Sequence, residues 1–254
     1  MVRKLRAKKR TLLVDGDIVC YRIATAIEEA TEWEDDMWTL HSDAKLGKEL
    51  LDNALSKYLK QLNCNDIVIA LSDKNNFRKK LFPEYKSHRK KIRKPIIVKP
   101  LKEYIYKKYS TYRLPDLEGD DTLGILATSK YKDNCVILSS DKDMRTIPCF
   151  HHFIHDNHTE LVDEKTANYY FMFQTLTGDT SDGYSGIKGC GAVKAERVLF
   201  NSEKTLPSMW KAVVEEYKRN NLTEKDALLQ ARMARILRSS DYNFKTKKPI
   251  LWRL

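Results

Sequence analysis

The sequence has few cysteines and no long hydrophobic run. Its 254 residues include only five widely spaced cysteines with no Cys-x-x-Cys pair: Cys20, Cys64, Cys135, Cys149 and Cys190. This pattern argues against a disulfide framework or a zinc site and predicts reduced thiols. Apolar runs such as 67–71 and 136–138 are far shorter than the roughly 20 residues that span a bilayer.

The start of the chain also lacks a secretory signal. Six basic residues between Arg3 and Arg10 are followed by only a short apolar run. With 42% hydrophobic residues, a chain of this length can bury a substantial core, which excludes general disorder. We therefore expect a soluble, cytoplasmic, globular protein with no membrane partner.

Positive charge is concentrated in one segment. The chain carries a formal net charge of +11, and residues 74–108 alone contain fourteen basic residues against Glu84 and Glu103. Such a segment is typical of a surface that binds the phosphates of a nucleic acid, and its interleaved aromatic residues could stack on bases. The alternative is a pair of helices with solvated lysines on their outer faces.

Strand-like and helix-like segments alternate in the first part of the chain. Short apolar runs at 11–15, 66–71, 111–114 and 135–139 predict buried strands. Apolar residues at helical spacing over 46–62 and 117–131 predict helices between them. We expect an α/β fold with a mainly parallel central sheet flanked by helices, whose site lies at the carboxyl ends of the strands.

Beyond about residue 163 the pattern is entirely helical. Helices are predicted over 164–176, 192–200, 206–218 and 223–237. The chain should therefore consist of an α/β core over 1–162 and a helical part over 163–254 that packs tightly on it.

Acidic residues follow every predicted strand of the core. In chain order these are Asp15 and Asp17, then Asp73, then Glu118, Asp120 and Asp121, then Asp141 and Asp143. Any one of them could be a helix cap or a turn residue. Together at one sheet edge they would repel each other unless multivalent cations neutralised them, and all-oxygen ligation favours Mg²⁺ or Mn²⁺. Acidic sites with two such ions suit phosphodiester cleavage, so this edge beside a basic segment predicts a nuclease.

Two further carboxylates, Asp179 and Asp182, precede a glycine-rich turn at 186–191 that opens a helix. The free backbone N–H groups of such a turn can meet a phosphate. Alone, the turn could be an ordinary connection between helices. After two candidate metal ligands it favours a clamp on the backbone of duplex DNA, without base contacts.

The order of these motifs resembles the structure-specific 5′-nucleases, the flap endonuclease superfamily, and in particular the 5′→3′ exonucleases of lytic podophages. The motifs are Asp15-Gly16-Asp17, Phe77-Arg78-Lys79-Lys80, Glu118-Gly119-Asp120-Asp121, Ser140-Asp141-Lys142-Asp143 and Gly178-Asp179 through Ala192. The resemblance extends from about residue 11 to residue 253. It implies a PIN-like nuclease core and a helix-three-turn-helix DNA clamp in the helical part.

The resemblance also implies roles for individual residues. Ligands of a first Mg²⁺ would be Asp15, Asp73, Glu118, Asp120 and Asp141, with Asp121 adjacent, and those of a second would be Asp143, Asp179 and Asp182. In the basic segment 74–108, a helical gateway, Lys86 and Arg89 would be catalytic by steering the scissile phosphate. DNA would be bound by Tyr21, Arg22, Lys79 and Lys80, and by the clamp through Gly186, Lys188, Gly189, Gly191 and Lys194. In the family the clamp also holds a K⁺ ion.

Some features depart from the family pattern. Asp17 stands where many relatives carry a neutral residue, and Ala192 replaces a common proline. Pro95 and Pro100 interrupt the gateway, which leaves open a closed arch or a loop with short helices.

Two alternatives to a nuclease follow from the same residues. Asp15-x-Asp17 after a strand is also a mark of haloacid-dehalogenase-like phosphohydrolases, although Val19 replaces the expected threonine. A DNA-binding module without catalysis would explain the basic segment but not the acidic edge. The histidines at 151, 152, 155 and 158 favour a surface strand over a zinc site.

The combined prediction is a Mg²⁺-dependent 5′→3′ exonuclease and flap endonuclease, with Mn²⁺ as a substitute, acting on 5′ ends of double-stranded DNA and on RNA in RNA–DNA hybrids. A role in phage DNA replication or host DNA degradation, in the cytoplasm of the host cell, is implied by the resemblance alone. The absence of any additional domain predicts a stand-alone enzyme. We also expect a monomer.

Overall fold

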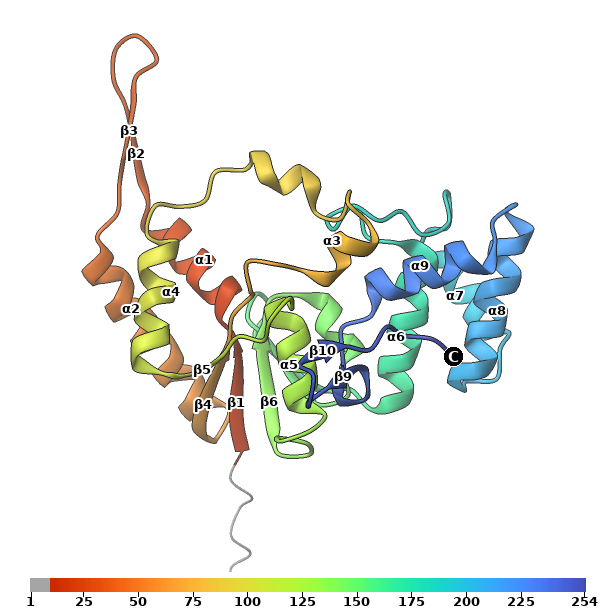
Figure 1. Ribbon diagram of the computed structural model, residues 1–254. Coiled ribbons are helices and arrows are strands. Elements are labelled where there is room, and N and C mark those ends of the chain that lie inside the picture. The colour runs from red at the N-terminus through yellow and green to blue at the C-terminus, as the bar shows by residue number, and fades with distance from the viewer. Residues whose placement is uncertain (1–9) are drawn as a thin grey trace, which may run out of the picture.

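The computed structural model describes residues 10–254, and most of the basic N-terminal run lies outside them. A six-stranded sheet lies at the centre, in the order β5-β4-β1-β6-β7-β8. The strands are β1 (Arg10–Asp15), β4 (Cys64–Ala70), β5 (Ser110–Tyr112), β6 (Cys135–Ser139), β7 (Phe150–Phe153) and β8 (His158–Leu161). The first five are parallel and β8 is antiparallel to β7. The predicted α/β class and mainly parallel sheet are confirmed (Figure 1).

Helices cover both faces of this sheet. One face packs on α1 (Gly16–Ala26), α2 (Ala44–Gln61) and α4 (Val98–Lys108), through buried residues such as Leu12, Leu51 and Leu101. The other face packs on α5 (Gly119–Ala127) and η2 (Lys142–Thr146) through Leu13 and Leu123. Alternate residues of β1 thus enter different cores, as expected for a buried parallel strand.

The helical part of the chain has its own core. It contains α6 (Glu164–Thr177), α7 (Ala192–Phe200), α8 (Leu206–Arg219) and α9 (Glu224–Ala234). Trp252 packs edge-on against Phe171 and Trp210, with ring centroids 5.0 and 4.9 Å apart, and so belongs to this core. Helix α6 also lies against η2, so the helical part packs directly beside the carboxyl end of β6 (Figure 1). Beyond it, η3 (Ser239–Asp241) precedes the short pair β9 (Tyr242–Asn243) and β10 (Lys248–Pro249).

The basic segment runs across the edge where the strands end (Figure 1). It consists of α3 (Phe77–Leu81), η1 (Ser87–Lys91), an extended stretch and α4. This is a loop with short helices. On the far side of α1, β2 (Glu29–Glu32) and β3 (Trp38–His41) form a separate hairpin that projects from the body.

Two local predictions are wrong. The histidine strand is not on the surface: His151 and His152 in β7 are each 1% exposed, because β7 is covered on both faces and flanked by β6 and β8. The last predicted helix ends at Ala234 and not at residue 237. The guanidinium of Arg78 donates hydrogen bonds to the carbonyl oxygens of Met233 and Arg235, at 3.1 and 2.5 Å. These two bonds hold the chain after α9 in an extended conformation.

Candidate active site

A small acidic pocket lies at the carboxyl ends of the parallel strands. Its lining includes five carboxylates and two buried tyrosines: Glu118, Asp120, Asp141, Asp143, Asp182, Tyr85 and Tyr184. Asp15, at the end of β1, is electrostatically linked to Asp120 and Asp141 at this pocket. The expected convergence of acidic residues from separate strands is therefore present for these positions.

Local structure fixes the orientation of the carboxylates. Asp15 caps α1 by accepting a hydrogen bond from Ile18 N at 3.1 Å, and it also accepts one from Ser139 Oγ at 2.9 Å. Asp141 caps η2 and accepts the N–H of Asp143 at 2.8 Å. Helix capping, which could account for each of these residues on its own, thus also orients both side chains toward the pocket.

Burial makes this cluster electrostatically unfavourable when it is fully ionised. Burial, together with the nearby charge of Asp17, raises the pKa of Asp15 to about 7. Burial and the neighbouring Asp141 likewise raise the pKa of Asp143 to about 7. The pKa values of Asp120 and Asp141 are also raised by burial, with further contributions from adjacent carboxylates. Such a site favours bound positive charge.

Lys86 supplies part of that charge. Its Nζ lies 2.7 Å from Oε1 of Glu118 and 3.3 Å from Oδ2 of Asp182. Burial alone would raise the pKa of Glu118, but the positive charges of Lys86 and Arg78 outweigh this effect and lower the pKa to about 2. Arg89 lies further out, where it donates to Asp182 at 2.8 Å and to the carbonyl oxygen of Ser181. The two predicted catalytic cations are therefore both at the mouth of the pocket.

Asp121 does not face the pocket. It is fully buried, and Arg78 binds both of its oxygens at 2.7 and 2.8 Å. The backbone N–H groups of Leu237 and Glu118 donate to the same oxygens. With its hydrogen-bonding capacity used in this way, Asp121 anchors α5 to the chain after α9 and is not placed as a metal ligand.

Two other acidic residues form ion pairs with basic side chains outside the pocket. Asp73 forms an ion pair with Arg113 at 3.2 Å, and a hydrogen bond from the Asp116 N–H lowers its pKa. Asp17 forms an ion pair with Lys102 and accepts the N–H of Ser72 at 2.8 Å. Neither lines the acidic pocket, so a metal role for Asp73 stays a prediction.

The remaining donor set fits hard divalent cations. Every side-chain group in it is a carboxylate oxygen, which is the chemistry preferred by Mg²⁺ and Mn²⁺. Within residues 10–254, no group of three such side chains already encloses a single point as a metal cage does. The evidence that divalent cations fit this site is therefore the chemistry of the donor atoms and the burial of carboxylates whose pKa values are raised.

Asp179 and Asp182 lie on a tight loop after α6. Asp179 accepts the N–H of Ser181 at 2.7 Å and pairs with Tyr184 through the backbone. Asp182 reaches the pocket, where its Oδ2 and Oε2 of Glu118 each lie 2.9 Å from the hydroxyl of Tyr85. No role in the site was predicted for Tyr85, and its position directly before the candidate catalytic residue Lys86 is the signal that could have indicated one.

The glycine-rich turn follows directly. Gly186 and Gly189 adopt left-handed φ angles of 57° and 77°, which favour glycine. Gly189 and Gly191, the N-cap residue of α7, face open space, so a ligand can approach their backbone closely. Lys188 is exposed, whereas Lys194 is tied to Glu216 at 2.8 Å.

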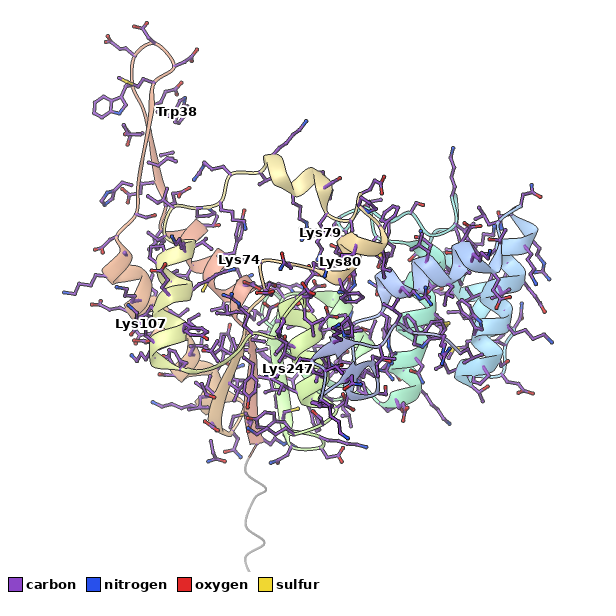
Figure 2. The ribbon with its side chains drawn as sticks, viewed as in Figure 1. Trp38, Lys74, Lys79, Lys80, Lys107 and Lys247 are labelled. Carbon is purple, nitrogen blue, oxygen red and sulfur yellow. The ribbon has the colours of Figure 1, made fainter. Side chains whose placement is uncertain are left out.

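The other predicted DNA contacts are spread around the pocket. Tyr21 is 45% exposed on α1, and Arg22 lies 3.4 Å from the Ser140 hydroxyl. Figure 2 shows Lys79 and Lys80 on α3, above the ends of the strands. Lys80 pairs with Asp116 at 2.7 Å, while Lys79 is exposed.

Comparisons with known proteins agree with this arrangement. Residues 10–171 match the family described as 5′-3′ exonuclease, N-terminal resolvase-like domain. The chain belongs to this 5′-3′ exonuclease family. It is 31% identical to the exonuclease of Escherichia phage T7, covering 96% of this chain and 94% of the relative. It is 30% identical to the exodeoxyribonuclease of Enterobacteria phage T3, at 96% and 93% coverage.

Solved structures share the fold. The T5 D15 protein, co-crystallized with metal ions, superimposes with a TM-score of 0.68 at 13% identity, over 89% of each chain. The catalytic core of Rad2 in complex with a DNA substrate gives 0.53 at 16% identity, over 87% of this chain and 67% of that one. The family resemblance inferred from the ordered acidic motifs is confirmed, as is the assignment to the nucleases. Membership of this family excludes the dehalogenase-like alternative and favours an enzyme over a DNA-binding module without catalysis.

Within residues 10–254, no helix combines the length and apolar character needed to cross a membrane.

Proposed function

We propose that this enzyme is a Mg²⁺-dependent 5′→3′ exonuclease and flap endonuclease that hydrolyses phosphodiesters at the 5′ ends of double-stranded DNA. The observation that carries the proposal is the buried carboxylate cluster at the sheet edge, which lies between the basic segment and the glycine-rich turn. A related T5 flap endonuclease was solved as a pseudo-enzyme-product complex with DNA and metal ions, which supports this use of the fold.

Two groups of carboxylates would hold the ions. The first group is Asp15, Glu118, Asp120 and Asp141, with Asp73 in an outer position, and the second is Asp143, Asp179 and Asp182. Mg²⁺, with Mn²⁺ as a substitute, would activate water and neutralise the charge that develops on the phosphate. The carboxylates would hold the ions in position, and their burial would exclude competing solvent.

Lys86 and Arg89 would hold the scissile phosphate. Both cations lie at the pocket mouth, on the side from which a DNA end would arrive under the basic segment. With ions bound to these carboxylates, Glu118 would attract the Lys86 ammonium less strongly, and Lys86 would be available to the phosphate. Stabilisation of developing negative charge is the chemistry expected of such a pair.

The duplex beyond the cut would be held by its backbone. Gly189 and Gly191 offer backbone N–H groups and Lys188 offers an exposed charge, whereas the N–H of Gly186 already donates to Oε1 of Gln230 at 2.8 Å. The same turn would hold a K⁺ ion. Tyr21, Arg22, Lys79 and Lys80 would contact the unpaired end. None of these contacts reads bases, so the RNA strand of an RNA–DNA hybrid is a further substrate. The enzyme would act in phage DNA replication or host DNA degradation, in the host cytoplasm.

Matched end-labelled substrates test the proposal. A linear duplex labelled at its 3′ ends is incubated with the enzyme in Mg²⁺ or in EDTA, beside the same duplex labelled at its 5′ ends. We expect immediate release of the 5′ label and progressive shortening of the 3′-labelled strand, only with Mg²⁺. Binding without cleavage in Mg²⁺ and in Mn²⁺ would exclude the proposal, and early release of the 3′ label would reverse its polarity.

A further inference from the structure

The β2–β3 hairpin exposes large apolar side chains. Trp33, Met37 and Trp38 near its tip are 54, 60 and 55% exposed, and every residue of β2 is exposed. Figure 2 shows Trp38 well away from the body of the protein. An isolated two-stranded hairpin is marginally stable in water, and clustered exposed tryptophans mark interaction sites. This hairpin has the character of a docking element.

The hairpin is acidic in an otherwise basic protein. Residues 29–41 contain five acidic residues, Glu29, Glu32, Glu34, Asp35 and Asp36, and no lysine or arginine. The turn itself is formed by Asp35 and Asp36, both with left-handed φ angles of 61° and 57°. Phosphates would be repelled by this charge. The hairpin therefore requires a basic surface with an apolar centre, which DNA does not offer.

A surface of that kind lies on the helical part of the same chain. An open groove of about 710 Å³ runs between α6, α7 and the start of α8. Its walls include Val193 and Phe200, which are 82 and 78% exposed, and its inner side includes Tyr169, Leu199 and Met209. The volume and the apolar lining suit aromatic side chains.

The edge of this groove is basic. Lys165, Arg197 and Lys204 line it and are exposed, against one acidic residue, Glu196. In the described part of the chain none of the three cations forms an ion pair. Acidic hairpin and basic groove are therefore complementary both in charge and in apolar character.

We propose that the hairpin tip of one copy docks in the groove of a second copy. Figure 1 shows the hairpin and helices α7 and α8 at opposite ends of the molecule, so one chain cannot close this contact on itself. The contact is head-to-tail, and it adds copies in one direction or closes a ring. It replaces the expectation of a monomer, while each copy retains its complete acidic pocket.

Sedimentation velocity of the full-length enzyme in EDTA, without DNA, tests the contact. Over about 1 to 100 μM protein at low salt we expect concentration-dependent species larger than one chain, which dissociate at high salt because charged groups are screened. The double variant Trp33→Ser/Trp38→Ser should weaken association about tenfold or more. Phe244→Ser is the matched control, because Phe244 is also exposed (57%) but lies outside both surfaces.

Charge reversal tests the pairing of the two surfaces. One variant carries Glu32→Lys and Glu34→Lys in the hairpin, and the other carries Lys165→Glu and Lys204→Glu in the groove. Each alone should stay monomeric, and an equimolar mixture should regain association through the reversed pair. A wild type that is monomeric at every concentration overturns the proposal. So does a tryptophan variant that weakens DNA binding while leaving self-association unchanged, since the hairpin would then contact DNA.

Discussion

The ammonium group of Lys86 lies 2.7 Å from Oε1 of Glu118, at the mouth of the acidic pocket. Only 13% of the lysine side chain and 16% of the glutamate side chain are exposed, so this ion pair is largely shielded from water. It ties the basic segment to the sheet edge. It also places a positive charge where a phosphate would meet the carboxylates.

We expect Lys86→Ala to slow cleavage much more than it weakens binding. Loss of one cation that stabilises developing charge lowers kcat by about 10²–10³-fold, whereas loss of one phosphate contact changes DNA affinity only a few-fold. Single-turnover cleavage in Mg²⁺ and DNA binding in Ca²⁺ separate the two effects. Lys79→Ala is the control, because the exposed Lys79 should affect binding and salt dependence only. Equal losses in both assays for Lys86→Ala would assign Lys86 to binding.

Asp143 should support activity at a cost in stability. We expect Asp143→Ala to abolish cleavage and to leave DNA binding largely intact, since the clamp does not depend on it. Loss of both would indicate misfolding or a binding role for this edge. Asp143→Asn, which keeps the shape, should also lose cleavage, by more than about 10³-fold.

The same carboxylate makes a pH-dependent prediction. Because the pKa of Asp143 rises to about 7 on folding, the folded state binds its proton more tightly than the unfolded chain. The free-energy cost of ionising Asp143 in the folded state is absent below the ordinary aspartate pKa. This loss of folding stability grows as the pH rises toward 7, and it reaches its full size above pH 7. Asp143→Asn should therefore raise stability at pH 8 in EDTA by up to about 4 kcal/mol, because a rise in pKa from 3.8 to about 7 corresponds to about 1.4 kcal/mol for each pKa unit, and Tm should rise by several degrees. The difference from wild type should vanish near pH 4, and a gain that persists there would have another cause.

The sequence was sufficient for the sheet edge but not for every contact at it. Asp15 and Asp141 directly follow apolar runs, and parallel strands bring such positions to one edge. The burial of Asp121 could not be predicted in this way, because its partner Arg78 belongs to a segment in which most of the other described cations face solvent. Local pattern does not distinguish a basic residue for DNA from one that neutralises a buried acid.

The hairpin and the histidine strand show the same limit. Nothing in the alternation of His151 and His152 shows whether a strand lies at the edge of a sheet or inside it, because that depends on which strands are added beside it. Residues 29–41 carry no apolar run, so the pairing of β2 with β3 was not predicted. It depends on a turn at Asp35 and Asp36 in left-handed conformations, which these residue types adopt only occasionally.

Removal of Arg78 should destabilise the whole fold. Arg78→Met leaves the Asp121 carboxylate buried without a positively charged partner and leaves two backbone carbonyls without their donor, so we expect a loss of about 3–5 kcal/mol. Arg78→Lys should recover little, because an ammonium group cannot bind both oxygens and both carbonyls. Chemical denaturation measures these differences. The double variant Arg78→Met/Asp121→Leu should be more stable than Arg78→Met, and an equally unstable double variant would show that the carbonyl contacts dominate.

The turn at Gly189 separates backbone strain from contact with DNA. Its φ of 77° is strained for alanine, while a Cβ there meets nothing within 4 Å, so Gly189→Ala should cost about 1 kcal/mol of stability without a clash. The added methyl group would hold a phosphate away from the backbone N–H groups, and we expect DNA affinity to fall about tenfold while kcat at saturating DNA changes less than about twofold. Asn221→Ala is the matched control, because Asn221 also has a left-handed φ, of 59°, but lies in the turn between α8 and α9. Fluorescence anisotropy and thermal unfolding of both variants decide the matter: an equal loss of affinity in both would mean that strain, and not contact with the phosphate, weakens binding.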